Sequence, residues 1–181
     1  MVDAMNNLYQ KHREEVEDIL SRYPEKRAAV MPLLWLAQEE YGYVSKEAMR
    51  EVAQICELDP TDVYAVAHFY SLYFKEPVGK YVIRFCTDMP CALVGSEQVY
   101  QYLLDKLGIK DGETTPDGLF TAQQAVCLAA CGAAPVMQIN FQYFANLTPQ
   151  RIDEILDLVR ANGLPPNGPL RFEPREESSD A

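Results

Sequence analysis

The chain has 181 residues, of which 48% are hydrophobic, and its 27 acidic and 16 basic residues give a net charge of −11. This balance argues against nucleic acid as a partner, because such binding depends on Lys and Arg side chains that neutralise phosphates. No apolar run approaches the roughly eighteen residues needed to cross a bilayer, so we expect no direct membrane insertion.

Apolar residues at helical spacing indicate two helices near the start of the chain. The first is predicted over residues 6–22 and the second over residues 25–41. Pro32 lies early in the second segment, so we expect it either to begin that helix or to kink it.

Two further helices are indicated by capping residues. Ser45 is a predicted N-cap for a helix that reaches about Cys56. Asp59 followed by Pro60 is typical of a helix start, and we expect this helix to continue to about Phe74.

The pattern changes from helical to mixed at a short Pro/Gly turn over residues 75–79. A strand over residues 81–85, a helix over residues 99–107 and a strand over residues 119–126 then form a β-α-β unit. A hairpin over residues 135–145 and a last helix over residues 148–163 complete the predicted elements. We therefore expect a first domain over residues 1–76, a second over residues 77–163, and an extended or disordered tail over residues 164–181.

Four of the five cysteines form two close pairs, and each pair directly follows a predicted strand. Cys86 and Cys91 are the first pair, and Cys127 and Cys131 are the second. If the two strands are parallel neighbours, the loops that follow them lie at the same edge of the sheet. The four thiols can then bind one metal centre.

Four thiolates suit either zinc or an iron-sulfur cluster. Paired zinc ligands usually have about two residues between them, whereas a 2Fe-2S cluster has two irons and allows longer loops. The spacing favours the cluster and leaves a non-redox, zinc-bound adaptor as an alternative. Disulfides are less favoured because the first residues contain no apolar signal segment, which predicts the reducing cytosol.

Two other residues of metal-binding type are interpreted as structural. Cys56 has no partner at ligand spacing, and a free cysteine in a helical pattern is usually a small buried hydrophobe. His68 is more often a buried or boundary residue than a ligand, since soft thiolates already complete the site.

The sequence around the cysteines resembles a known family. Residues 77–91 and 127–140 are closely similar to the small 2Fe-2S subunit of respiratory complex I, a family with thioredoxin-like ferredoxin domains. The family also includes diaphorase parts of NAD-linked hydrogenases and formate dehydrogenases. The likeness runs from about Tyr9 to Gly163. Two departures are Ala129, where the family often has Gly, and Phe141, where it usually turns with acidic or glycine residues.

This resemblance implies an α+β fold, with an N-terminal helical bundle before a thioredoxin-like α/β ferredoxin domain. It also implies a one-electron carrier of an NADH:quinone oxidoreductase, with NADH and FMN on a partner subunit and a large iron-sulfur subunit in the same module. Such a module is peripheral on the cytoplasmic side of the inner membrane. An equivalent subunit of a hydrogenase or formate dehydrogenase is the alternative. The implied ligands of the 2Fe-2S cluster are Cys86, Cys91, Cys127 and Cys131.

Overall fold

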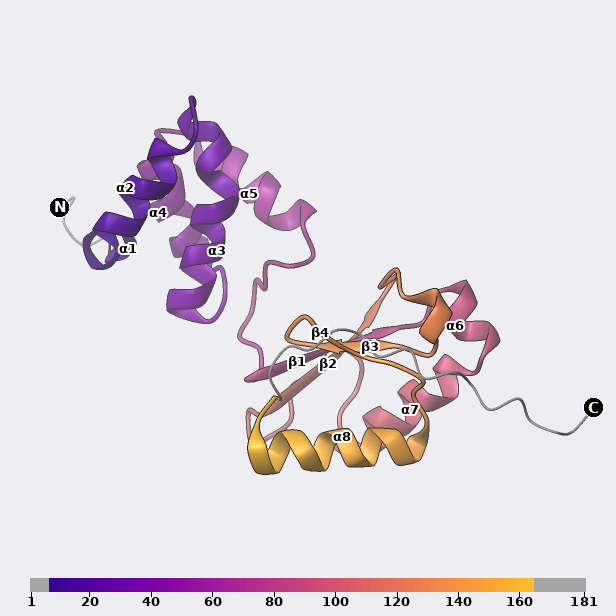
Figure 1. Ribbon diagram of the computed structural model, residues 1–181. Coiled ribbons are helices and arrows are strands. Elements are labelled where there is room, and N and C mark those ends of the chain that lie inside the picture. Colours follow the sequence, from indigo (N-terminus) through magenta and orange to yellow (C-terminus); the bar gives the residue numbers. More distant parts are fainter. Residues whose placement is uncertain (1–6, 165–181) are drawn as a thin grey trace, which may run out of the picture. The chain divides into compact units, whose positions relative to one another are not determined.

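The computed structural model describes residues 7–164. The chain divides between Val78 and Gly79 into two compact units, which are described separately (Figure 1). The predicted tail lies outside the described residues, except for Leu164. Among the described residues, no helix is long and apolar enough to span a membrane.

The first unit consists of helices around an apolar core. Leu33 and Leu34 are fully buried at the centre of this core, and residues from each of the other α-helices pack around them. The elements are α1 (Asn7–Lys11), α2 (Arg13–Ser21), the short 3-10 helix η1 (Lys26–Ala29), α3 (Val30–Tyr41), α4 (Lys46–Cys56) and α5 (Pro60–Phe69).

Two predicted helices of this unit differ from the observed ones. The helix predicted over residues 6–22 is interrupted at His12, whose backbone (φ −120°, ψ 36°) leaves the helical region. The segment predicted over residues 25–41 begins as a 3-10 turn and becomes α-helical only at Val30. Pro32 therefore lies in the first turn of α3, where its missing N–H removes no intrahelical bond.

Helix α5 ends at Phe69 and not at Phe74, because the segment after it bonds to α3. The backbone of Tyr70 is extended (φ −93°, ψ 117°). Gln38 of α3 donates from Nε2 to the Leu72 carbonyl (3.1 Å) and accepts at Oε1 from the Phe74 amide (2.7 Å). These bonds satisfy backbone groups that a longer helix would otherwise use.

The two predicted N-caps are confirmed. Ser45 Oγ accepts a hydrogen bond from the Ala48 amide (3.1 Å), and Asp59 Oδ1 accepts one from the Thr61 amide (2.8 Å). Pro60 occupies the first turn of α5. Each cap satisfies an amide that has no partner within its own helix.

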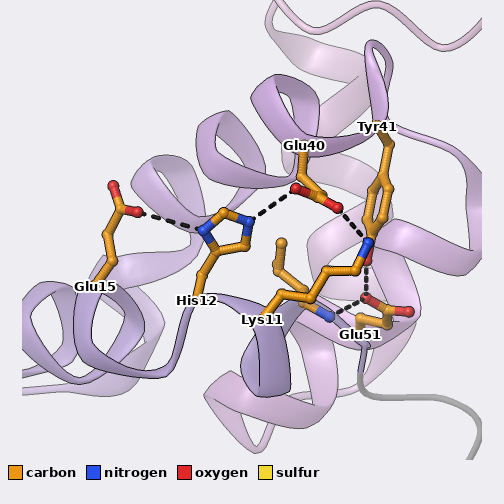
Figure 2. A network of polar contacts seen from close by, with 7 residues as sticks. Lys11, His12, Glu15, Glu40, Tyr41 and Glu51 are labelled. Carbon is orange, nitrogen blue, oxygen red and sulfur yellow. Dashed lines mark hydrogen bonds and ion pairs between the residues drawn. The ribbon is translucent and has the colours of Figure 1, made fainter.

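A buried carboxylate joins α1, α3 and α4 (Figure 2). Glu51 of α4 is 8% exposed, and its Oε2 accepts hydrogen bonds from the Leu8 amide (3.1 Å) and the Tyr41 hydroxyl (2.8 Å). Beside it, His12 Nε2 contacts Glu40 Oε2 at 2.9 Å. These contacts anchor α1, which is too short to be stable as an isolated helix.

The second unit contains a four-stranded sheet of order β2-β1-β3-β4. Strands β1 and β2 are parallel, whereas β3 is antiparallel to both β1 and β4. The predicted β-α-β unit is thus confirmed. The strands are β1 (Tyr81–Cys86), β2 (Phe120–Ala125), β3 (Met137–Ile139) and β4 (Gln142–Phe144), and the helices are α6 (Met89–Leu93), α7 (Ser96–Leu107), η2 (Cys131–Ala133) and α8 (Pro149–Asn162).

Helices α7 and α8 cover one face of this sheet (Figure 1). Alternate residues of β1, namely Tyr81, Ile83 and Phe85, lie in a core that includes Leu103 of α7 and Leu156 of α8. This alternation follows from the two-residue period of a strand. The opposite face of β1 therefore carries the side chain of Cys86.

The β3-β4 hairpin turns through Asn140 (φ 45°) and Phe141 (φ 71°). Positive φ at both central residues is the signature of a type I′ turn. Asn140 Oδ1 accepts from the Val82 amide (2.8 Å) and its Nδ2 donates to the Lys80 carbonyl (2.9 Å), while the Arg84 guanidinium lies 4.8 Å from the Phe141 ring centre. Contacts with β1 thus hold a conformation that is costly for a bulky residue.

Candidate metal centre

The first cysteine pair lies where β1 ends and α6 begins. Cys86 is the last residue of β1 and Cys91 lies in α6, and they are only 2% and 1% exposed. Asp88 precedes α6, and Pro90 lies in its first turn, where proline is favoured. This short connection brings the first predicted pair together in the interior, where both side chains belong to one group of buried residues.

Strand β2 brings the second pair to the same edge of the sheet. Cys86 lies opposite Ala125 in the parallel pairing, and Cys127 follows Ala125 by two residues. Cys131 begins η2, and both residues of this pair are exposed. The condition stated for a shared site, that the two strands are parallel neighbours, is therefore met.

Apolar side chains surround the buried pair. Burial, together with the neighbouring Cys86 and Cys131 thiols, raises the pKa of the Cys91 thiol to about 11. A thiol of this kind is protonated at neutral pH, so metal binding there must release a proton. The apolar residues packed around Cys86 and Cys91 are Leu128, Ala133, Ala134 and Val136.

The loop between the second pair contains a left-handed residue. Ala129 has φ 55°, a conformation that favours glycine and costs other residues about 1–2 kcal/mol. Its amide donates to Cys127 Sγ at 3.4 Å, and the Tyr143 hydroxyl donates to the Leu128 carbonyl at 2.8 Å. The family that this sequence resembles often has Gly at this position, and the backbone of Ala129 has the conformation that favours glycine.

Four thiols in two pairs suit a two-iron group. A 2Fe-2S cluster requires only two thiolates at each of its irons. The two pairs meet that requirement, because each follows one of two neighbouring parallel strands.

The residues excluded from the site lie in the first unit. Cys56 is 2% exposed within its core, and burial raises the pKa of its thiol to about 11. The prediction of a buried apolar role is confirmed. His68 is exposed, so the interpretation of a buried or boundary residue is wrong. Its ring stacks on Tyr64 with 3.7 Å between ring centres, and its Nδ1 lies 2.9 Å from the Tyr64 carbonyl oxygen.

Sequence reasoning missed α6 and a polar network beside Cys86. Asp111 Oδ1 accepts from the Tyr100 hydroxyl (2.6 Å) and the Gln124 amide (2.9 Å), and Gln124 Oε1 accepts from the Thr87 hydroxyl (3.3 Å). These four residues line a cavity of about 510 Å³. Asp111 falls between the helix predicted over residues 99–107 and the strand predicted over residues 119–126, so no local signal paired it with the strand.

Exposed apolar side chains flank the cysteines. Met89 and Leu93, on either side of Cys91 in α6, are 72% and 82% exposed, and Val126, directly before Cys127, is 86% exposed. Large apolar side chains gathered at a surface are typical of a protein interface.

The family model for thioredoxin-like 2Fe-2S ferredoxins matches residues 16–160. This chain belongs to that family. The match includes all four paired cysteines, and a 2Fe-2S cluster is the cofactor of thioredoxin-like 2Fe-2S ferredoxins. The predicted resemblance and the predicted cofactor are confirmed, and the zinc alternative loses its support.

Curated relatives of this thioredoxin-like ferredoxin are named as subunits of NADH-quinone oxidoreductase. The relative from Rhizobium meliloti is 44% identical over 149 residues, which cover 82% of this chain and 89% of the relative. The relative from Thermus thermophilus is 42% identical, with 81% and 82% covered. The relative from Mycobacterium tuberculosis is 38% identical over 160 residues, with 88% of this chain and 63% of the relative covered.

Among solved structures, an air-oxidised NAD+-reducing NiFe hydrogenase has a similar fold. The TM-score is 0.62 at 24% identity, with 71% of this chain and 23% of that chain covered. The same hydrogenase in its H2-reduced state gives 0.63. At this identity the likeness concerns the fold alone. Together with the family match, it agrees with the predicted mixture of helices and sheet in a thioredoxin-like ferredoxin fold.

Proposed function

We propose that this chain is the 2Fe-2S electron-transfer subunit of an NADH-quinone oxidoreductase, the respiratory complex I. The single observation that carries this function is the meeting of two thiol pairs at one sheet edge, in a chain 44% identical to a protein named as a subunit of that complex. NADH and FMN bind to a partner subunit. The chain is thus part of an oxidoreductase and carries electrons for it.

The proposed ligands are the two thiol pairs. Cys86 and Cys91 would hold one iron from the interior, and Cys127 and Cys131 would hold the other from the surface. When bound, the cluster accepts and releases one electron at a time. The apolar side chains around Cys86 and Cys91 exclude water from the inner side, while the exposed pair leaves the outer side open to a partner.

The proposed partners are the flavin- and NADH-binding subunit and the large iron-sulfur subunit of the same module. The exposed Met89, Leu93 and Val126 support an interface at the cluster edge, because apolar side chains of this size are normally covered in an assembly. Docking there brings the flavin close to the cluster. The module is held on the cytoplasmic side of the inner membrane through its other subunits.

The domain organisation is part of the proposal. An N-terminal helical bundle over residues 1–76 precedes the thioredoxin-like ferredoxin domain over residues 77–163, and residues 164–181 are assigned to neither domain. Separate apolar cores in the two units support this division, as does the boundary between Val78 and Gly79.

The test is to tag the chain in its native host, isolate the intact assembly gently, and identify its companions by mass spectrometry. A flavoprotein together with membrane-embedded subunits supports the proposal. If the companions are instead subunits of a hydrogenase or a formate dehydrogenase, that enzyme is the host, and the assignment of the 2Fe-2S cluster stands. Metal analysis of the same sample should give about two irons and two acid-labile sulfides per chain. One zinc without sulfide contradicts the function.

A further inference from the structure

We infer that Asp111 is a positioning residue for the cluster, because its carboxylate holds the chain on both sides of Cys86. Asp111 lies outside both cysteine loops, at the surface of the segment that follows α7. The inference rests on the proposed function, in which Cys86 is a cluster ligand. Two sets of contacts carry it, and both meet at Asp111 Oδ1.

The first set reaches the residue after Cys86. Asp111 Oδ1 accepts from the Gln124 amide at the end of β2 (2.9 Å). The side chain of Gln124 then accepts from the Thr87 hydroxyl (3.3 Å), and the Thr87 amide donates to the Ala125 carbonyl (3.4 Å). Thr87 is therefore bound to the last two residues of β2, and Asp111 fixes the first of them.

The second set reaches the residue before Cys86. The Tyr100 hydroxyl donates to Asp111 Oδ1 at 2.6 Å, and the Tyr100 ring packs on Phe85 with 5.1 Å between ring centres. Tyr100 is 3% exposed and Phe85 is fully buried. Burial, and then the bond to Asp111, raises the pKa of the Tyr100 hydroxyl, so this group remains a hydrogen-bond donor.

One carboxylate oxygen thus restrains Phe85 and Thr87, the two neighbours of Cys86. Hydrogen bonds to a charged acceptor are stronger than those between neutral groups. Groups that orient metal ligands without touching the metal typically change metal affinity about 10–100-fold when they are removed. Asp111 also fixes Gln124, three residues before Cys127, so both cysteine loops depend on it.

The experiment compares cluster-loaded full-length variants by electron paramagnetic resonance of the reduced state and by loss of iron to a chelator. Asp111→Ala removes the acceptor, whereas Asp111→Asn keeps a side-chain oxygen in its place. Tyr100→Phe removes one donor and keeps the ring on Phe85. The matched control is Tyr102→Phe, because the Tyr102 hydroxyl, also on α7, donates to Asp153 of α8 (2.8 Å) and not to the sheet.

We expect Asp111→Ala to shift or broaden the resonance signal and to lose iron on the order of tenfold faster. Tyr100→Phe should show a smaller change in the same direction. Asp111→Asn keeps the oxygen acceptor without its charge, so it should lie between Asp111→Ala and the wild type, while Tyr102→Phe should match the wild type. If the wild type binds a cluster and Asp111→Ala and Tyr100→Phe both match it, the positioning role is overturned and the proposed function stands. If the wild type itself binds no iron and sulfide, the proposed function fails. Should Asp111→Ala not fold, the Tyr100→Phe and Tyr102→Phe pair decides the question.

Discussion

Cys86 lies opposite Ala125 in the parallel pairing of β1 with β2, so Cys127, two residues after Ala125, follows at the same sheet edge. This single register brings the two cysteine pairs together, although they are far apart in the sequence. A slip of one residue in β1 would turn the Cys86 side chain to the opposite face, where α7 and α8 pack. The pairing of β1 with β2 is therefore a condition for the site and not only for the fold.

The first prediction concerns the ligands. Replacing any one of the four paired cysteines by serine should abolish or distort the resonance signal of the reduced cluster and lower the iron content, because a hard hydroxyl replaces a soft thiolate. The control is Cys56→Ser, in the core of the first unit, which should leave the signal intact. A normal signal in all four variants contradicts the ligand assignment. The four variants are Cys86→Ser, Cys91→Ser, Cys127→Ser and Cys131→Ser.

The second prediction concerns the cluster potential. Asp88 lies between Cys86 and Cys91 at the start of α6, and its negative charge disfavours the added electron. Asp88→Asn should raise the midpoint potential, by on the order of 20–60 mV for one charge near a surface. Asp88→Glu keeps the charge and should leave the potential close to that of the wild type. The measurement is a redox titration followed by electron paramagnetic resonance. An unchanged or lower midpoint potential in Asp88→Asn contradicts the proposed effect of the Asp88 charge.

Features with a local signal could be predicted from the sequence. Ser45 and Asp59 are N-caps because their short polar side chains bond to amides two or three residues ahead, which needs no knowledge of the rest of the chain. The positions of Cys86 and Cys127 at strand ends follow from β-branched and apolar runs directly before them. The ferredoxin family was recognisable from the same segments.

Features set by distant partners could not be predicted. Helix α5 stops at Phe69 because Gln38, more than thirty residues earlier, bonds to the segment after it. Asp111 lies 13 residues before Gln124 and accepts a hydrogen bond from its backbone amide, and no sequence periodicity links the two residues. Tertiary hydrogen bonds decide both cases, and they override helix propensity where the two compete.

The third prediction concerns the buried carboxylate of the first unit. Glu51→Ala leaves the buried Leu8 amide without its acceptor and removes the partner of the Tyr41 hydroxyl, so it should lower the free energy of unfolding by about 2–3 kcal/mol. Tyr41→Phe should cost about 1 kcal/mol. Glu51→Gln keeps an oxygen acceptor and should be less damaging than Glu51→Ala. Urea unfolding followed by the fluorescence of Trp35, the one tryptophan of the chain, measures this unit. Wild-type stability in Glu51→Ala contradicts the assignment.

The fourth prediction concerns pH. The Thr61 hydroxyl and then the Thr61 amide donate to the Asp59 carboxylate and lower its pKa. Because the folded pKa lies below the unfolded value of about 4, the stabilisation is present above pH 4 and is lost as the pH falls through the lowered pKa. The difference in urea midpoint between the wild type and Asp59→Ala should thus be constant from pH 7 to pH 5 and shrink below about pH 4.

The control for this pH effect is Asp59→Asn, which caps α5 through an amide oxygen that does not titrate in this range. The difference in urea midpoint between Asp59→Asn and Asp59→Ala should be the same at every pH at which both proteins fold. If the difference between the wild type and Asp59→Ala also stays constant down to pH 3, the ionised carboxylate is not the source of the stabilisation.

The fifth prediction concerns the close approach of Gly79 to β2. A Cβ at Gly79 would lie 2.9 Å from the Phe120 carbonyl carbon and 3.0 Å from its amide nitrogen, and backbone atoms cannot move aside as a flexible side chain can. Gly79→Ala should therefore lower the free energy of unfolding of the second unit by about 1–3 kcal/mol, as overpacking typically does. The matched control is Gly132→Ala, since a Cβ there meets no heavy atom within 4 Å. Denaturant unfolding followed by circular dichroism compares the two, and equal midpoints show that β2 can shift to accommodate the methyl group.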